Sequence, residues 1–145
     1  MILDHLDRHL PAAGGIEKAA VPMGMYLAWC VNLQLVSESL RERAEQALLR
    51  LRVRELRGSE LLVAACGGAL DSDDLNDAGR RFTEAYYSGY LDDLRSLTGG
   101  NPYAMTDDWP HYDQVAKMLT AKYYGHKPGW GRGRKGRRAW WRFWA

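Results

Sequence analysis

A run of aspartates between residues 71 and 77 is the first candidate for metal chemistry in this chain. Calcium sites of the EF-hand type need an oxygen ligand at the fifth loop position, glycine at the sixth and glutamate at the twelfth. Counted from Asp71, those positions hold Leu75, Asn76 and Phe82. The spacing therefore argues against a specific calcium site and favours acidic residues that stabilise the start of a helix.

Two histidines near the N-terminus, His5 and His9, are four residues apart and would share one face of a helix. Asp4 could join them, but zinc needs a fuller set of ligands than this segment provides. His111 has no serine or cysteine nucleophile at a recognisable spacing, and there is no phosphate-binding loop. We therefore predict no catalytic residues, no metal ion and no cofactor.

The sharpest local feature is the C-terminal segment 125–145, which is rich in glycine, arginine and tryptophan. Its cations would neutralise phosphates and its rings would stack on bases, as in nucleic-acid binding. The same composition suits an anionic membrane surface. Further interpretations are a clasp folded back on the body, or a disordered extension. The predicted nucleic-acid or membrane contacts are Trp130, Arg132, Arg134, Lys135, Arg137, Arg138, Trp140, Trp141, Arg142 and Trp144.

The formal net charge of +2 conceals a division of charge along the chain. Residues 1–121 hold 12 basic and 18 acidic residues, a charge of −6, whereas residues 122–145 hold eight basic residues and no acid. Such a split is more typical of an interaction surface than of a fold requirement. We expect an acidic surface of the body to bind a partner protein. Its predicted residues are Asp71, Asp73, Asp74, Asp77, Asp92, Asp93, Asp107 and Asp108.

These residues would be held by an all-α bundle of about five helices, because apolar residues recur at spacings of three and four. The first helix would bury a stripe that begins at Ile16, or it would begin near Val21, since Pro22 would kink or restart it. Ser37 and Ser59 are good N-caps for the second and third helices.

The aspartate run leads into a long fourth helix, in which Asn76 can cap the first turn. One of residues 106–108 would cap the fifth helix. The expected organisation is an N-terminal arm at 1–15, a helical domain at 16–124 and an irregular, basic, tryptophan-rich tail at 125–145.

Cys30 and Cys66 are the only cysteines, and both have apolar neighbours. Two buried thiols in a reducing cytosol are the simplest interpretation, although a disulfide would need only the right spacing in the fold. No apolar run approaches the ~18 residues that cross a bilayer, and the N-terminal residues are too polar for a secretory signal. These features predict a cytoplasmic protein without a transmembrane segment.

Three strings, in order, carry a family resemblance. Residues 23–30 read MGMYLAWC, residues 54–62 read RELRGSELL, and residues 74–79 read DLNDAG and are followed by Phe82. The set resembles a family of small bacterial domains of unknown function that carry GMxLAWC, RELxG and DLNxxGxxF strings. The resemblance spans about residues 16–120. The first fifteen residues and the basic tail depart from the family's pattern.

The resemblance implies no established activity. Small size and the lack of catalytic residues are similar to those of immunity proteins of bacterial toxin systems, which neutralise a toxin by binding it. Our leading hypothesis is therefore a non-enzymatic protein-binding domain, an immunity-type inhibitor of a cognate toxin. The alternative is a nucleic-acid-binding protein that acts through its tail. An enzyme is a third hypothesis, which a deep pocket around His111 and Tyr112 would favour.

Overall fold

The computed structural model describes residues 1–126, which are mainly helical. This confirms the expected all-α class, apart from one small sheet of β1 (Ile2–His5) and β2 (Ala69–Asp71). The helices are α1 (Leu10–Ala13), α2 (Ile16–Asn32), α3 (Glu38–Arg43), α4 (Glu45–Arg52), α5 (Gly58–Cys66), α6 (Asp77–Tyr86), α7 (Tyr90–Thr98) and α8 (Trp109–His126). Single 3-10 turns are η1 (Leu6–Arg8), η2 (Ser72–Asp74), η3 (Tyr87–Gly89) and η4 (Pro102–Ala104).

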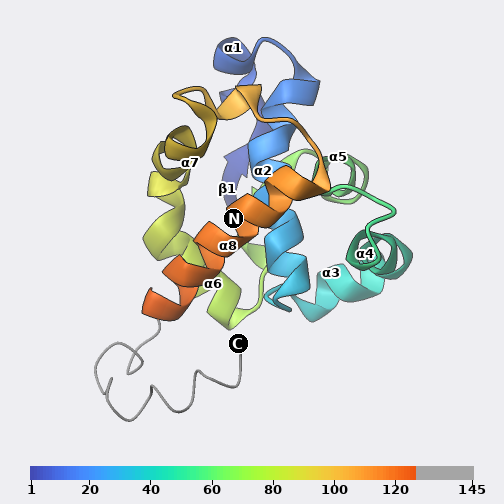
Figure 1. Ribbon diagram of the computed structural model, residues 1–145. Helices are drawn as coiled ribbons and strands as arrows, with labels where there is room; N and C mark the ends of the chain where they lie inside the picture. The colour runs from blue at the N-terminus through green and yellow to red at the C-terminus, as the bar shows by residue number, and fades with distance from the viewer. Residues whose placement is uncertain (127–145) are drawn as a thin grey trace.

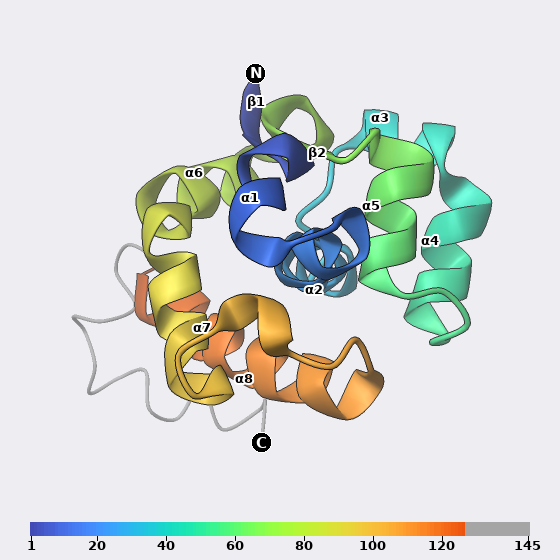
Figure 2. The same ribbon diagram turned by 90° about the horizontal axis from the view of Figure 1, so that it is seen from above.

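Helix α2 forms the axis of the molecule. Every residue from Ala19 to Val31 is buried, as is typical of a helix enclosed by others. Figure 2 looks along α2 and shows α1, α5, α6 and α8 arranged around it. Even so, no helix among residues 1–126 has both the length and the apolar character needed to cross a membrane.

Pro22 lies inside α2, so the alternative start near Val21 is wrong. Proline has no N–H, which leaves the carbonyl of Lys18 without its usual helical donor. Lys18 is exposed, so water can supply the missing hydrogen bond. The carbonyl of Pro22 also accepts a hydrogen bond from Tyr90 Oη at 2.7 Å, which ties α7 to α2.

All five expected helical segments are present, but two of them are broken. The second is divided at Ala44 into α3 and α4, and the fourth is divided by η3 into α6 and α7. The predicted cap at Ser37 is confirmed, because its Oγ accepts from the Leu40 N–H at 3.1 Å. The predicted cap at Ser59 is wrong: Arg57 holds the N-cap position of α5, and its N–H donates to Glu60 Oε1.

Residues 1–15, which we expected to form an arm, are packed on the body. Strand β1 pairs antiparallel with β2, and the Leu6 side chain is buried. Pro11 fits the first turn of α1, where its missing N–H costs nothing, and Gly14 ends the helix with a φ of 83°. The segment therefore contributes to the core and positions Asp4 and His9.

An aromatic cluster joins α2 to the helices that follow the sheet. The ring of Trp29 is fully buried and lies 5.4 Å from that of Phe82 on α6 and 5.7 Å from that of Tyr123 on α8. Tyr26 packs edge-on against Tyr90 of α7 at 5.1 Å. Each such pair adds about 0.5–1.5 kcal/mol beyond burial. Figure 1 shows the result: α8 crosses α2, with α6 and α7 on one side and α3, α4 and α5 on the other.

Candidate functional site

A buried polar network joins the N-terminal segment to distant turns. His9 lies between Asp4 and Tyr103: its Nε2 is 2.7 Å from Asp4 Oδ2, and its Nδ1 is 2.5 Å from Tyr103 Oη. All three residues are buried. In a neutral imidazole, the nitrogen that faces the carboxylate carries the hydrogen, so Nδ1 accepts from the tyrosine hydroxyl.

Asp4 is the central acceptor of this network. Its Oδ2 also accepts from Tyr87 Oη at 2.5 Å, and its Oδ1 accepts from the His5 N–H at 2.8 Å. Burial, followed by the charge of Asp4, raises the pKa of Tyr87 well above its ordinary value and also raises the pKa of Tyr103. Both hydroxyls therefore stay protonated and remain donors at neutral pH.

The order Asp4, His9, Tyr103 is that of a proton relay, and all three members are buried among residues 1–126. Both ring nitrogens of His9 and both oxygens of Asp4 are engaged inside the protein. Neither of the two surface grooves described below is lined by these residues. The network is therefore suited to holding β1, η3 and η4 together rather than to chemistry on a substrate.

The geometry does not support a metal site at the N-terminal histidines. His9 points towards Asp4, whereas His5 Nδ1 accepts from the Asp7 N–H at 3.0 Å and caps η1. In the described part of the chain, no three His, Cys, Asp or Glu side chains are placed to hold an ion. A deep pocket beside Tyr112 would have favoured an enzyme, but the cavity there measures only about 10 Å³, enough for about one water.

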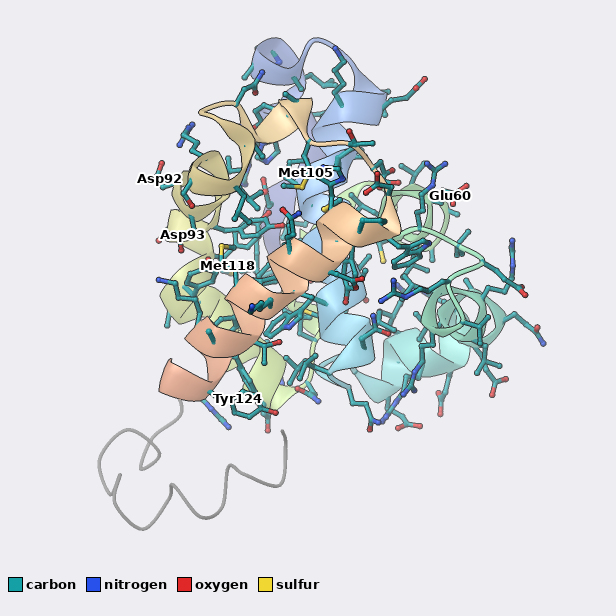
Figure 3. The ribbon with its side chains drawn as sticks, viewed as in Figure 1. Glu60, Asp92, Asp93, Met105, Met118 and Tyr124 are labelled. Carbon is teal, nitrogen blue, oxygen red and sulfur yellow. The ribbon has the colours of Figure 1, made fainter. Side chains whose placement is uncertain are left out.

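A groove of about 570 Å³ lies between the first half of α2 and α5. Ile16 and Val63 form its apolar edges and are 57% and 51% exposed, respectively. Ile16 was expected to lie in the buried stripe of its helix, and that expectation is wrong. The charged residues that line the groove are Glu17, Lys18, Arg57, Glu60 and Asp107. Figure 3 labels Glu60 at this edge of the molecule.

Hydrogen bonds fix the positions of the charged side chains on one wall of this α2–α5 groove. The Ser59 hydroxyl donates to Asp107 Oδ2 at 2.5 Å, and Arg57 Nη1 donates to the Asp107 carbonyl at 3.3 Å. The backbone N–H of Arg57 lowers the pKa of Glu60, so that this carboxylate stays ionised at neutral pH. Glu17 and Lys18, on the opposite wall, have no ion pair within residues 1–126.

A second groove, of about 240 Å³, lies where the end of α2 meets α3 and α4. We call it the α2–α4 groove. Its floor consists of buried aliphatic side chains, and its rim is mostly charged. The residues that line it are Val31, Gln34, Val36, Arg41, Glu45, Leu48, Leu49 and Arg52.

The eight aspartates predicted to bind a partner lie in three separate places. They are Asp71, Asp73, Asp74 and Asp77 from β2 to the start of α6, Asp92 and Asp93 on α7, and Asp107 and Asp108 before α8. In Figure 3, Asp92 and Asp93 lie on the side of the molecule opposite Glu60, which adjoins Ser59, the partner of Asp107. Of the eight, only Asp107 lines either large groove.

Each of these carboxylates has a partner within the chain. Asp74, for example, is buried and pairs with Arg43 at 3.1 Å. Asp108 Oδ1 accepts from the His111 N–H at 2.9 Å and so caps α8. Asp77 pairs with an arginine one turn later, in an exposed pair of little energetic value. A role of the eight in binding stays a prediction.

The tail residues predicted to bind nucleic acid or a membrane, Trp130 to Trp144, lie outside the described residues.

Both cysteines are free: Cys30 is buried, and Cys66 is half-buried at the end of α5. Burial raises the pKa of Cys66 to about 11 and raises that of Cys30 still further. Neither thiol is therefore a reactive thiolate at neutral pH.

Sequence reasoning missed Tyr87 and Tyr103, which lie 83 residues from Asp4 and 94 residues from His9, respectively. The available signal was Asp4 itself, an acidic residue in a short apolar segment that would need partners if buried. Nor did the sequence indicate that Val63 borders a groove, because the lining of a groove depends on how two helices pack.

No curated protein and no solved structure matches the chain. Residues 2–106 match a protein family described as a domain of unknown function (DUF7832), and no enzyme family is found. The match starts at residue 2, so the N-terminal segment lies within the family unit, whereas the resemblance was placed at about residues 16–120. All four residues of the buried network lie in the matched range, whereas α8 lies beyond it. Because the match covers well over half of the chain, the protein belongs to this family of domains of unknown function.

Proposed function

We propose that this protein is a non-enzymatic, cytoplasmic protein-binding domain, an immunity-type inhibitor that neutralises a bacterial toxin by direct contact. The observation that carries the proposal is the α2–α5 groove, where Ile16 and Val63 remain exposed between charged walls. An apolar centre within a polar rim is the usual anatomy of a protein interface. A pair of exposed aliphatic side chains beside a cleft can accept an anchoring side chain of the partner.

Charge favours a basic partner for this groove. Its lining holds the carboxylates Glu17, Glu60 and Asp107 against the cations Lys18 and Arg57. Residues 1–121 have a formal charge of −6, so the body as a whole attracts a cationic protein and speeds its encounter. The aspartates at 71–77, 92–93 and 107–108 contribute to this field even where each has a local partner.

The chemistry of the groove supports binding rather than catalysis. No histidine or cysteine lines it, so the lining lacks the imidazole and thiol groups that most often act as general base or nucleophile. The only described histidine buried in the fold, His9, faces Asp4 and Tyr103 instead. Nucleic-acid binding through the tail rests on the composition of residues 125–145, and no contact in residues 1–126 adds to it.

Co-expression with the product of the adjacent open reading frame tests the proposal. We expect that product to inhibit growth alone, to lose its toxicity when this chain is present, and to elute with it from a sizing column. Val63→Asp should abolish protection, whereas Leu97→Asp, at an exposed leucine of α7, should leave it intact. A neighbouring product that stays fully toxic and forms no complex with the wild-type chain contradicts the proposal.

A further inference from the structure

The α2–α4 groove combines an apolar floor with a cationic rim. Val31, Val36 and Leu48 form the floor and are 3%, 2% and 6% exposed, respectively. Arg41 and Arg52 stand at the rim with a single carboxylate, Glu45. This is the reverse of the α2–α5 groove, in which carboxylates outnumber cations. The two grooves are therefore suited to different partners.

The rim of this groove has an unpaired cation. Arg52 makes no ion pair with any described residue, whereas Arg41 is held by the exposed Glu38 at 2.7 Å. An exposed pair of that kind exchanges readily for another carboxylate, because it is worth under about 1 kcal/mol. Both guanidiniums can therefore receive a carboxylate from outside the chain.

Helix α4 carries an exposed apolar stripe beside the groove. Leu49 and Val53 are four residues apart, so they lie on the same face of the helical turn. They are 57% and 65% exposed and are among the most exposed large apolar residues of the described chain. Leu49 also lines the groove, so it extends the apolar floor towards the surface, and Val53 follows it one turn later. An apolar face of this kind is the feature that an amphipathic helix recognises.

Gln34, which lines the groove, adopts a backbone conformation that favours glycine. Its φ is 59°, in the left-handed region, which costs a non-glycine residue roughly 1 kcal/mol. Its main-chain carbonyl accepts from Asn76 Nδ2 at 2.9 Å, an interaction that glycine would make equally well. Its side-chain amide is exposed and has no hydrogen bond to any described residue. This conformation ends α2, because it lets the Leu35 N–H donate to the Cys30 carbonyl at 2.8 Å, and it leaves the Gln34 amide free at the groove.

From these observations we propose that the α2–α4 groove binds an acidic amphipathic helix of another protein. An apolar side chain of that helix enters the floor and packs on Leu49. Its carboxylates pair with Arg52 and Arg41, and a polar group of its backbone or side chain meets the amide of Gln34. This surface is separate from the toxin-binding groove and does not depend on the proposed function.

Fluorescence anisotropy with three labelled peptides of about 15 residues tests this proposal on the full chain. The first places leucines on one face and glutamates on the other. The second replaces the glutamates with lysines, and the third keeps the glutamates but replaces the leucines with serines. We expect the first peptide to bind roughly tenfold more tightly than either of the others, and more weakly as salt increases.

The third peptide controls for the basic tail, which would attract any acidic peptide. Leu49→Ser should weaken binding of the first peptide, and Arg52→Glu should remove its advantage over the lysine peptide. The matched change Val63→Ser, in the other groove, should have no effect. Gln34→Gly should raise the denaturation midpoint of the protein and still weaken peptide binding.

Several results would overturn the proposal. One is equal binding of the glutamate–leucine and glutamate–serine peptides, since tail electrostatics would then account for it. Another is binding that is unchanged in both Leu49→Ser and Arg52→Glu. The proposal is also wrong if none of the peptides binds. If the toxin still binds the protein while the peptides give any of these results, only the peptide-binding proposal is wrong and the proposed function is unaffected.

Discussion

Gly24 of α2 and Gly58 of α5 meet backbone to backbone where the two helices cross. A methyl group added at Gly58 would lie 1.9 Å from the Gly24 carbonyl oxygen, and one added at Gly24 would lie 2.3 Å from the Ser59 nitrogen. Both obstacles are main-chain atoms, which cannot rotate away as the end of a side chain can. This crossing sets the distance between the helices and therefore the width of the α2–α5 groove.

Replacing either glycine should separate the helices. We predict that Gly58→Ala lowers the free energy of unfolding by about 3 kcal/mol, since the overpacked backbone has to move. Chemical denaturation measures this loss. Gly89→Ala is the control and should be nearly neutral, because nothing lies within 4 Å of the added methyl group. A Gly58→Ala protein as stable as the control would show that the crossing is looser than described.

The buried network predicts a second large effect. Asp4→Ala would leave the His9 imidazole, the Tyr87 hydroxyl and the His5 N–H without their acceptor. Unsatisfied buried donors cost about 1–3 kcal/mol each, so we expect a loss of about 3 kcal/mol or more in urea denaturation. Asp73→Ala, at an exposed aspartate, should change stability by less than about 0.5 kcal/mol. Similar losses for the two variants would contradict the structural role of the network.

Alkaline pH should destabilise the fold through its buried tyrosines. Burial raises the pKa of Tyr90 and Tyr87 well above the ordinary value of 10.0. Below pH 10 these tyrosines are protonated in both the folded and the unfolded chain, so pH has no effect on them. Above it only the unfolded chain ionises, and the free energy of unfolding falls by ~1.4 kcal/mol per pH unit for each tyrosine.

Denaturation midpoints measured between neutral and strongly alkaline pH would reveal this fall. Tyr90→Phe should make the decline shallower, because that variant removes one of the titrating groups. It also removes the hydrogen bond to the Pro22 carbonyl, so its stability at neutral pH provides the baseline. An alkaline slope as steep in Tyr90→Phe as in the wild type would exclude Tyr90 as a source of the effect.

The two cysteines should differ in their access to thiol reagents. Cys66 is half-buried with a pKa of about 11, whereas Cys30 lies on α2 and its side chain is fully buried. We predict that a disulfide reagent labels Cys66 slowly in the native protein and labels Cys30 only in denaturant. Mass spectrometry of the Cys66→Ser variant provides the check. Native labelling of Cys30 at the rate of Cys66 would mean that α2 opens more readily than its packing implies.

Local features of the sequence predicted much of the helical fold, because they act over a few residues. The apolar run of α2 indicates burial, and the caps at Ser37 and Asn76 both form as predicted. The predicted N-cap was wrong at α5, where a neighbouring residue favours a different start of the helix. Arg57 caps α5 in place of Ser59 because Glu60 accepts the Arg57 N–H, and Gly58 enters the helix.

The candidate sites were harder to predict because they depend on contacts between distant segments. Asp4 and His9 were considered together as metal ligands. Their partners Tyr87 and Tyr103 come from turns that are more than 80 residues away along the sequence. The β1–β2 pairing that positions Asp4 involves only a few residues, too short for strand periodicity to show. The exposure of Ile16 and Val63 likewise follows from how α2 and α5 cross, which periodicity alone does not specify.

We propose that the α2–α5 groove binds a protein toxin, and isothermal titration calorimetry of the purified toxin against wild type, Val63→Asp and Leu97→Asp would measure this binding. We expect tight one-to-one binding by the wild type and Leu97→Asp, and at least about a hundredfold weaker binding by Val63→Asp, as expected for a buried anchor replaced by a charge. Equal affinity of all three proteins would show that the toxin docks elsewhere, and no heat of binding from the wild type would show that the chain does not bind it.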